Sequence, residues 1–169
     1  MKYLMLVFAV FGMEVCWGAV GEKNLIAQRE LNPKVNIGYK SQDGCSFMYS
    51  PIDFCDDRHM EAIRGALKDR APNFANKFIL ITIPERDEYN QVSVVAVDSV
   101  TAEVYPLPID SISGVKGKTG KNGDINFKLN ENKICIYGDV LIYKSIKERE
   151  LCFVLEGGRF VGSHTAYMD

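Results

Sequence analysis

The chain contains two histidines, and the acidic residues around the first suggest acid–base or metal chemistry. His59 follows Asp56 and Asp57 and precedes Glu61, so three carboxylates lie close to one imidazole in the sequence. Such a group can hold a metal ion or orient the ring for proton transfer. The same residues also suit the solvated start of a helix, where an aspartate caps the backbone. We favour the helix start and expect His59 to point away from the apolar stripe of that helix.

Ser163 and His164 are a second candidate, because a serine and a histidine can form part of a hydrolase triad. That chemistry needs a rigidly held base beside the nucleophile, and residues near a chain end are often poorly ordered. The sequence also has no Gly-x-Ser-x-Gly segment. We therefore expect no catalytic residue. An exported envelope hydrolase stays open as an alternative, and it requires His59 or His164 beside a carboxylate and a pocket.

The segment 114–119 ends in Gly-Lys-Thr, as a phosphate-binding loop does. That motif needs an earlier glycine, and the required position holds Ile112. No helical pattern follows the segment. We interpret it as a surface loop rich in glycine and lysine, and we expect no nucleotide or other cofactor.

The first residues have the pattern of a secretory signal peptide. Lys2 precedes an apolar run at 3–13, which is much shorter than the 20 or so residues that cross a bilayer as a helix. Small residues follow, so we predict a signal peptide over residues 1–21, with cleavage after Gly21 and, as second choice, after Gly18. The mature protein is then periplasmic or secreted, without stable membrane insertion. Lipoprotein processing at Cys16 is disfavoured because Val15 is not a small residue.

The cysteines indicate disulfides. Loss of the leader would remove Cys16 from the five cysteines and leave an even number, which is typical of disulfides in an exported chain. No Cys-x-x-Cys or Cys/His spacing favours a metal. Four cysteines allow three pairings. We favour the pairing in which both bridges are local in sequence, Cys45–Cys55 and Cys135–Cys152. The second bridge would join neighbouring strands.

Composition points to one folded domain over residues 22–169. The chain of 169 residues is 47% hydrophobic and 11% aromatic, which is too apolar for a disordered protein. A formal net charge of -2 argues against a nucleic-acid partner, because such proteins usually carry a basic excess.

One helix is predicted over about 57–69. Asp56 or Asp57 supplies its N-cap, Met60, Ile63 and Leu67 form one apolar stripe, and a proline at position 72 stops it. Gly65 within the helix costs about 1 kcal/mol relative to alanine, which suggests a close packing contact.

The rest of the pattern favours strands. The continuous apolar run at 77–83 predicts a central strand covered on both faces. Residues 45–55 predict a loop closed by the Cys45–Cys55 disulfide, with a short strand in it; we call this the stapled loop. Further strands are expected at 91–98, 102–105, 125–129, 133–137, 139–144, 150–155 and 159–162, with turns at 130–132, 138 and 157–158. This order predicts a mainly β fold, an antiparallel meander with one short α-helix.

Several segments resemble those of small exported bacterial proteins, most of which have no assigned activity. The resemblance covers roughly residues 58–162 and is clearest in Pro72-Asn73-Phe74-Ala75 and in Gly157-Gly158-Arg159-Phe160. It implies propeller-blade-like strand pairs. Some periplasmic immunity proteins, which neutralise cell-wall-degrading effectors of type VI secretion, are similar in size and β architecture. The chain departs from the family at 83–91, where relatives carry a cysteine loop, and at Asn76, where glycine is usual.

Together these observations suggest a periplasmic binding or inhibitor protein whose partner is another protein. One form of it is an immunity protein that blocks a cell-wall-degrading toxin enzyme. We expect recognition by two polar loops, because recognition usually resides in loops on a rigid scaffold. Tyr89, with Arg86 beside it, would be an anchor, and Ser111 and Ser113 would enter a narrow cleft of the partner. The candidate binding residues are Glu85, Arg86, Asp87, Glu88, Tyr89, Ser111, Ser113, Lys116 and Lys118. Simple solvation of both loops, and an envelope structural module without inhibitory activity, are the alternatives.

Overall fold

The computed structural model describes residues 32–38, 44–113, 123–142 and 145–162, and for 145–149 the backbone alone. Three groups of expectations concern residues outside these ranges. They are the signal peptide with Cys16, the segment 114–122 with Lys116 and Lys118, and the Ser163–His164 pair.

Over the described residues the fold is mainly β with one α-helix, as the sequence predicts. The helix α2 spans Asp57–Asp69, and a short 3-10 helix, η1, spans Asp87–Tyr89. The strands are β1 (Lys34–Val35), β2 (Phe78–Arg86), β3 (Gln91–Asp98), β4 (Glu103–Pro106), β5 (Ser111–Ile112), β6 (Asp124–Phe127), β7 (Lys133–Ile142), β8 (Ser145–Glu156) and β9 (Arg159–Gly162).

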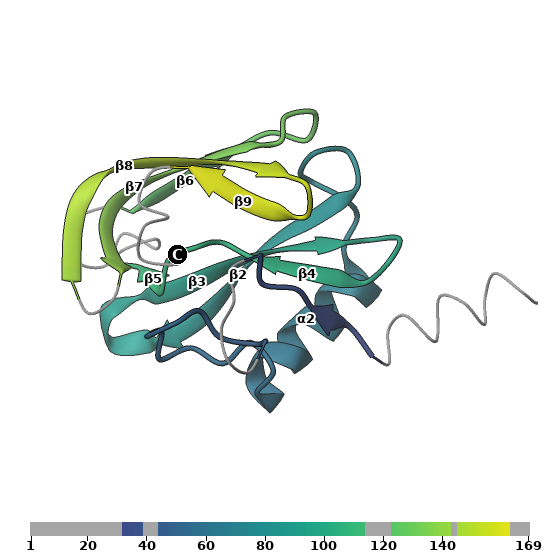
Figure 1. The fold of residues 1–169 in the computed structure, drawn as a ribbon, viewed down its shortest axis with the longest axis horizontal. Coiled ribbons are helices and arrows are strands. Elements are labelled where there is room, and N and C mark those ends of the chain that lie inside the picture. The colour runs from purple at the N-terminus through teal and green to yellow at the C-terminus, as the bar shows by residue number, and fades with distance from the viewer. Residues whose placement is uncertain (1–31, 39–43, 114–122, 143–144, 163–169) are drawn as a thin grey trace, which may run out of the picture.

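All nine strands belong to one sheet that curls back over itself, rather than to separate propeller-like blades (Figure 1). Strand β3 pairs with β2 along one edge and with β4 and β5 along the other. Strand β5 continues the sheet to β7, which pairs with β6 and β8, and β8 pairs with β9. The pairing is antiparallel except between β1 and β4, which run parallel, so the fold is not a pure meander.

Two apolar cores lie on opposite faces of the β2–β3–β4 region. The first fills the inside of the curl, between these strands and β7–β9, and includes Leu80, Val94 and Phe153. The second lies between the outer face and α2, and includes Ile63, Ile81 and Val95 (Figure 1). Successive residues of β2 and β3 alternate between the two cores, which explains why these strands read as continuous apolar runs.

Strand β2 is covered on both faces but is not central, because its ladder pairs only with β3 among the described strands. The prediction of a central strand was therefore wrong in position. Burial of both faces and pairing of both edges are separate properties, and the apolar run reports only the first.

Other elements differ from the prediction. Gly138 does not form a turn: β7 runs through it, and its φ of 120° is one that glycine tolerates. The stapled loop 45–55 contains no strand in its described residues. Gly65 does not mark a close contact either, since a Cβ added there would meet nothing within 4 Å. Asn76 adopts the left-handed φ of 62° that favours glycine or asparagine.

The structure contains both local disulfides. Cys45 and Cys55 lie 5.6 Å apart at Cα and close the loop that packs Phe47 and Phe54 into the second core. Cys135 and Cys152 are direct cross-strand neighbours on β7 and β8, 4.1 Å apart at Cα. Two disulfides fit a protein that works outside the cytoplasm, where such bonds persist.

Candidate functional site

The site begins at the start of α2. Asp56 is the N-cap, and its Oδ1 accepts a hydrogen bond of 2.8 Å from the backbone N–H of His59. This satisfies one of the backbone donors that every helix start leaves free. The sequence predicts this cap, although it does not choose between Asp56 and Asp57.

His59 is buried, with 1% of its surface exposed, and the expectation that it points into solvent was wrong. The residues of α2 that are fully buried are His59, Ile63 and Ala66, spaced i, i+4 and i+7. Met60 and Leu67, from the predicted stripe, pack only partly against the core. The helix is therefore rotated toward the side that carries His59, whose ring packs edge-on to Phe54 with centroids 5.2 Å apart.

Both nitrogens of the His59 ring meet carboxylates. Nδ1 lies 2.7 Å from Asp56 Oδ1, and Nε2 lies 2.8 Å from Glu85 Oε1. Glu85 comes from the end of β2, where the register with β3 shifts between Pro84 and Arg86 and leaves Glu85 without a partner. Such a bulge redirects a side chain, and here it accompanies a glutamate turned toward the helix start.

Arg58 completes the group. Its Nη2 donates to Glu85 Oε2 at 2.7 Å, and its Nη1 donates to the carbonyl of Pro84. We call Asp56, Arg58, His59 and Glu85 the charge cluster. The Glu85 side chain is 11% exposed, whereas those of Asp56 and Arg58 are about half exposed, so the buried ion pair within the cluster is His59–Glu85.

The cluster keeps its members charged. Burial alone would lower the pKa of His59, but hydrogen bonds to Glu85 and Asp56 outweigh it and hold this pKa above its ordinary value of 6.5. Burial would raise the pKa of Glu85, but hydrogen bonding from His59 and Arg58 outweighs it and lowers this pKa. The pKa of Asp56 is lowered for the same reasons, with burial opposed chiefly by the N–H and ring of His59. Two cations thus neutralise two anions.

This arrangement suits a structural clamp, which holds two elements of the fold together, better than it suits catalysis. A general base needs a free nitrogen lone pair, and the two carboxylates favour the imidazolium with a proton on each nitrogen. The ring is also closed off from solvent. The charge cluster therefore joins the start of α2 to the end of β2.

A recess of about 140 Å³ lies beside the cluster, and we call it the polar recess. It brings together the stapled loop, the end of β2, the start of β3 and the segment around β5. Its lining residues are Pro51, Ile52, Glu85, Arg86, Gln91, Asp110, Ser111 and Leu141. Glu85, Arg86 and Ser111, which the sequence assigns to two separate loops, thus meet at one site.

Ser111 cannot enter a partner's cleft, because it belongs to β5 and is only 2% exposed. Its neighbour Ile112 completes this short buried strand between β3 and β7, so the polar, glycine-rich pattern of 111–123 conceals a core element. The Ser111 hydroxyl has no hydrogen-bond partner within the described residues. Ser113 is half-buried, and its N–H donates to the carbonyl of Asp139 at 2.9 Å.

The β2–β3 connection rises from the rim of the polar recess. Arg86, Asp87, Glu88 and Tyr89 are exposed, Tyr89 to 54%. The 3-10 helix η1 ends at Tyr89. The C-cap residue Asn90 has a φ of 48°, and its N–H donates to the carbonyl of Asp87 at 3.1 Å. We call 86–89 the Tyr89 tip. It is a short ordered turn with an exposed aromatic ring.

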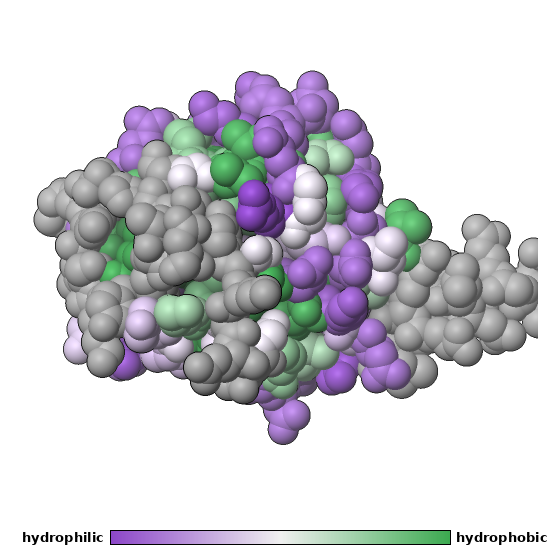
Figure 2. Space-filling view, viewed as in Figure 1, coloured by the Kyte–Doolittle hydropathy of each residue, from purple (hydrophilic) through white to green (hydrophobic). Residues whose placement is uncertain are grey.

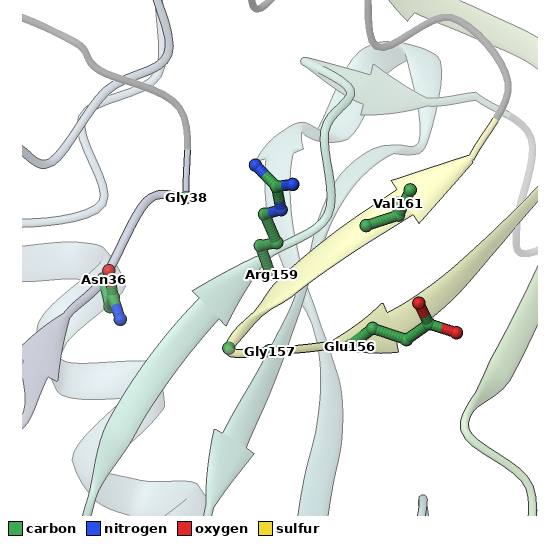
Figure 3. Close-up of a pocket in the computed structure, with 7 residues that line it drawn as sticks. Asn36, Gly38, Glu156, Gly157, Arg159 and Val161 are labelled. Atoms are coloured by element: carbon green, nitrogen blue, oxygen red, sulfur yellow. The ribbon is translucent and has the colours of Figure 1, made fainter.

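A wider concavity of about 600 Å³ lies between the segment after β1 and the β8–β9 turn (Figure 3). Arg159 and Glu156 point to different sides of that turn. Both side chains are exposed, and no buried charged group lines the described walls. The described part of the face in Figure 2 is mainly hydrophilic, with apolar residues in separate groups. Neither feature defines a ligand.

Among the residues that the structure describes, two clusters have the composition of a metal site, but both consist of a disulfide and one carboxylate. They are Cys45–Asp53–Cys55 and Cys135–Glu150–Cys152. Oxidised sulfur is not the thiolate that binds metals, so neither cluster supports a metal centre.

Comparisons with protein families, curated proteins and solved structures find no match to this chain. Within the described ranges, no helix is both long and apolar enough to cross a membrane.

Proposed function

We propose that this chain is an exported protein that binds and inhibits another protein, and that its contact surface is the Tyr89 tip together with the polar recess. The specific form we favour is an immunity protein that blocks a cell-wall-degrading toxin in the periplasm. The resemblance of residues 58–162 to small exported proteins, the signal-peptide pattern and the two disulfides support this form.

The observation that carries the proposal is the mounting of an exposed aromatic ring on a buried support. Tyr89 is 54% exposed, while Glu85, four residues before it, is fixed by His59 and Arg58. Tyrosine and arginine are among the residue types that most often dominate binding energy at protein interfaces. An anchor that is already ordered loses less conformational entropy on binding than a flexible loop does.

The enclosure of His59 argues against the alternative of a hydrolase. A buried imidazolium with a carboxylate on each nitrogen has no position left for a nucleophile or a substrate proton. The carboxylate and the pocket that this alternative requires are present at Glu85, but the ring is not among the residues that line the pocket.

The test is inhibition of wall hydrolysis by the purified, oxidised protein. Muramidases, amidases and lipases that act in the periplasm and are encoded beside this chain's gene would be assayed with and without the purified protein. We expect one of them to be inhibited at equimolar protein. Tyr89→Ala should weaken the inhibition by at least tenfold, because truncating a central aromatic anchor costs about 2 kcal/mol or more.

The matched control is Leu129→Ala, which truncates an equally exposed apolar side chain outside the proposed surface. It should leave inhibition unchanged. Equal loss with both variants would contradict the assignment of the surface. Absence of inhibition for every neighbouring enzyme, or turnover by the protein itself that His59→Gln abolishes, would overturn the proposed function.

A further inference from the structure

The outer edge of β2 carries backbone groups that the β2–β3 ladder does not use. Phe78 shows which residues face outward: its N–H and C=O pair with Phe74, at 2.9 and 3.0 Å, on the side away from β3. In an antiparallel strand, outward-facing residues recur at every second position. Because the register is regular from Phe78 to Pro84, the outward positions are 78, 80, 82 and 84.

Three of these four positions are covered by the chain itself. At Leu80, the side-chain amide of Asn73 makes the two hydrogen bonds that a neighbouring strand would make. Its Oδ1 accepts from the Leu80 N–H at 2.7 Å, and its Nδ2 donates to the Leu80 C=O at 3.1 Å. At Pro84 there is no N–H, and Arg58 donates to the C=O. Covering an exposed edge in this way prevents uncontrolled strand pairing.

Thr82 is the exception. It is exposed, and within the described residues neither its N–H nor its C=O has a partner on the outer side. One donor and one acceptor are therefore open between two covered positions. The covered positions, Leu80 and Pro84, lie about 13 Å apart at the usual rise of a strand.

A recess follows the edge at this position. It measures about 570 Å³ and lies between α2 and β2. Its helix side is formed by Ala62, Gly65, Ala66, Asp69 and Arg70, and its sheet side by Ile81, Thr82, Pro84 and Val92. A Cβ built on Gly65 would meet nothing within 4 Å, so the space beside the helix is open. We call this the edge recess.

We propose that Thr82 and the edge recess form a docking site for a short extended peptide segment of a partner protein. Its central residue would exchange two backbone hydrogen bonds with Thr82, which is strand addition limited to a single position. The open donor–acceptor pair matches an extended peptide residue, and the covers at Leu80 and Pro84 exclude a long strand. The inference does not depend on the proposed inhibitor role.

The geometry also defines the side chains that fit. In the bound peptide, the side chains of the two residues next to the central one point to the face of the sheet opposite to that of the central side chain, which is the face toward α2. They would enter the space beside Gly65, where Ala62 and Ala66 form an apolar wall and the charged Asp69 and Arg70 lie exposed at the end of the helix. We therefore expect medium-sized apolar residues at the two flanking positions and a small residue at the centre.

The experiment uses one probe, the peptide acetyl-Ser-Leu-Ala-Leu-Ser-amide, titrated into the isotopically labelled, oxidised protein and followed by amide NMR shifts. We expect saturable shifts centred on Thr82 and Gly65. A control peptide with N-methylated central alanine cannot donate its hydrogen bond and should bind about fivefold more weakly. Gly65→Leu, which fills the recess, should weaken binding at least tenfold, whereas the smaller Gly65→Ala should weaken it less. Amide spectra check that both variants fold.

Shifts that map away from β2, or equal binding of the N-methylated peptide, would overturn the proposal. Hydrogen exchange of the Thr82 amide in the free protein distinguishes the other occupants. Protection that grows with protein concentration would indicate a second copy on this edge, and protection independent of concentration would indicate a segment of the same chain. Either result would also overturn it. Loss of inhibition by Tyr89→Ala tests the other surface, so the two proposals fail separately.

Discussion

Replacement of His59 by leucine tests whether the charge cluster holds the helix to the sheet. The change leaves the Glu85 carboxylate buried without its histidine, and removing one partner of a buried ion pair usually costs about 3–5 kcal/mol. Arg58 still donates to Glu85 at 2.7 Å, and Asp56 is half exposed and can be solvated. We therefore expect a loss near the lower limit, about 3 kcal/mol of unfolding free energy, or about 6–12 °C in Tm.

The assay is urea unfolding of the oxidised protein, followed by far-UV circular dichroism. Glu61→Gln is the matched control, because Glu61 is exposed on the same helical turn and should change the free energy by less than about 0.5 kcal/mol. The double variant His59→Leu/Glu85→Leu should be more stable than the sum of the single losses predicts, by about 1–3 kcal/mol. A loss below 1 kcal/mol for His59→Leu, or strictly additive single variants, would refute the clamp.

Three further predictions follow from the same contacts. The raised pKa of His59 adds stability that is complete below pH 6.5 and is lost as pH rises through the pKa of the folded state, while the lowered pKa values of Asp56 and Glu85 add stability that is complete above about pH 4.5 and is lost as pH falls through their folded-state values. The free energy of unfolding should therefore be greatest between about pH 4.5 and 6.5. Urea unfolding of His59→Leu at a series of pH values should lack the decline on the alkaline side. Cys135→Ala/Cys152→Ala should lower the free energy of unfolding by about 3 kcal/mol in the same assay, and an unchanged midpoint would argue against a stabilising crosslink. Asn73→Ala uncovers both backbone groups of Leu80, so it should cost about 2 kcal/mol and increase self-association in sedimentation velocity, and a monomer of unchanged stability would contradict the role of Asn73 as an edge cover.

Local signals in the sequence predict much of the fold. The cap at Asp56 and the proline at position 72 give the helix bounds, and the observed helix is Asp57–Asp69. The strands at 91–98 and 159–162 follow from alternation and flanking turns. These features depend on neighbours within a few residues. The parallel β1–β4 pair and the edge position of β2 depend on contacts distant in the chain, which alternation does not encode.

The charge cluster shows the same limit. His59 and Glu85 are 26 residues apart, and each alone looks like a solvated surface residue. Two signals were nevertheless present. His59 shares the i, i+4 spacing with Ile63, and Glu85 continues the alternation of Ile81 and Ile83, whose side chains face α2. Joining the two requires knowing that the helix packs on that face of β2.

The Cys135–Cys152 bond also bears on survival after damage. If a protease cut the backbone anywhere between these residues, the two fragments would stay covalently tethered through a bond that joins neighbouring strands. Such a nicked molecule would migrate as one species until reduced. In surroundings rich in proteases, a single cut between these cysteines would therefore leave β9, which follows Cys152, covalently attached to the rest of the molecule.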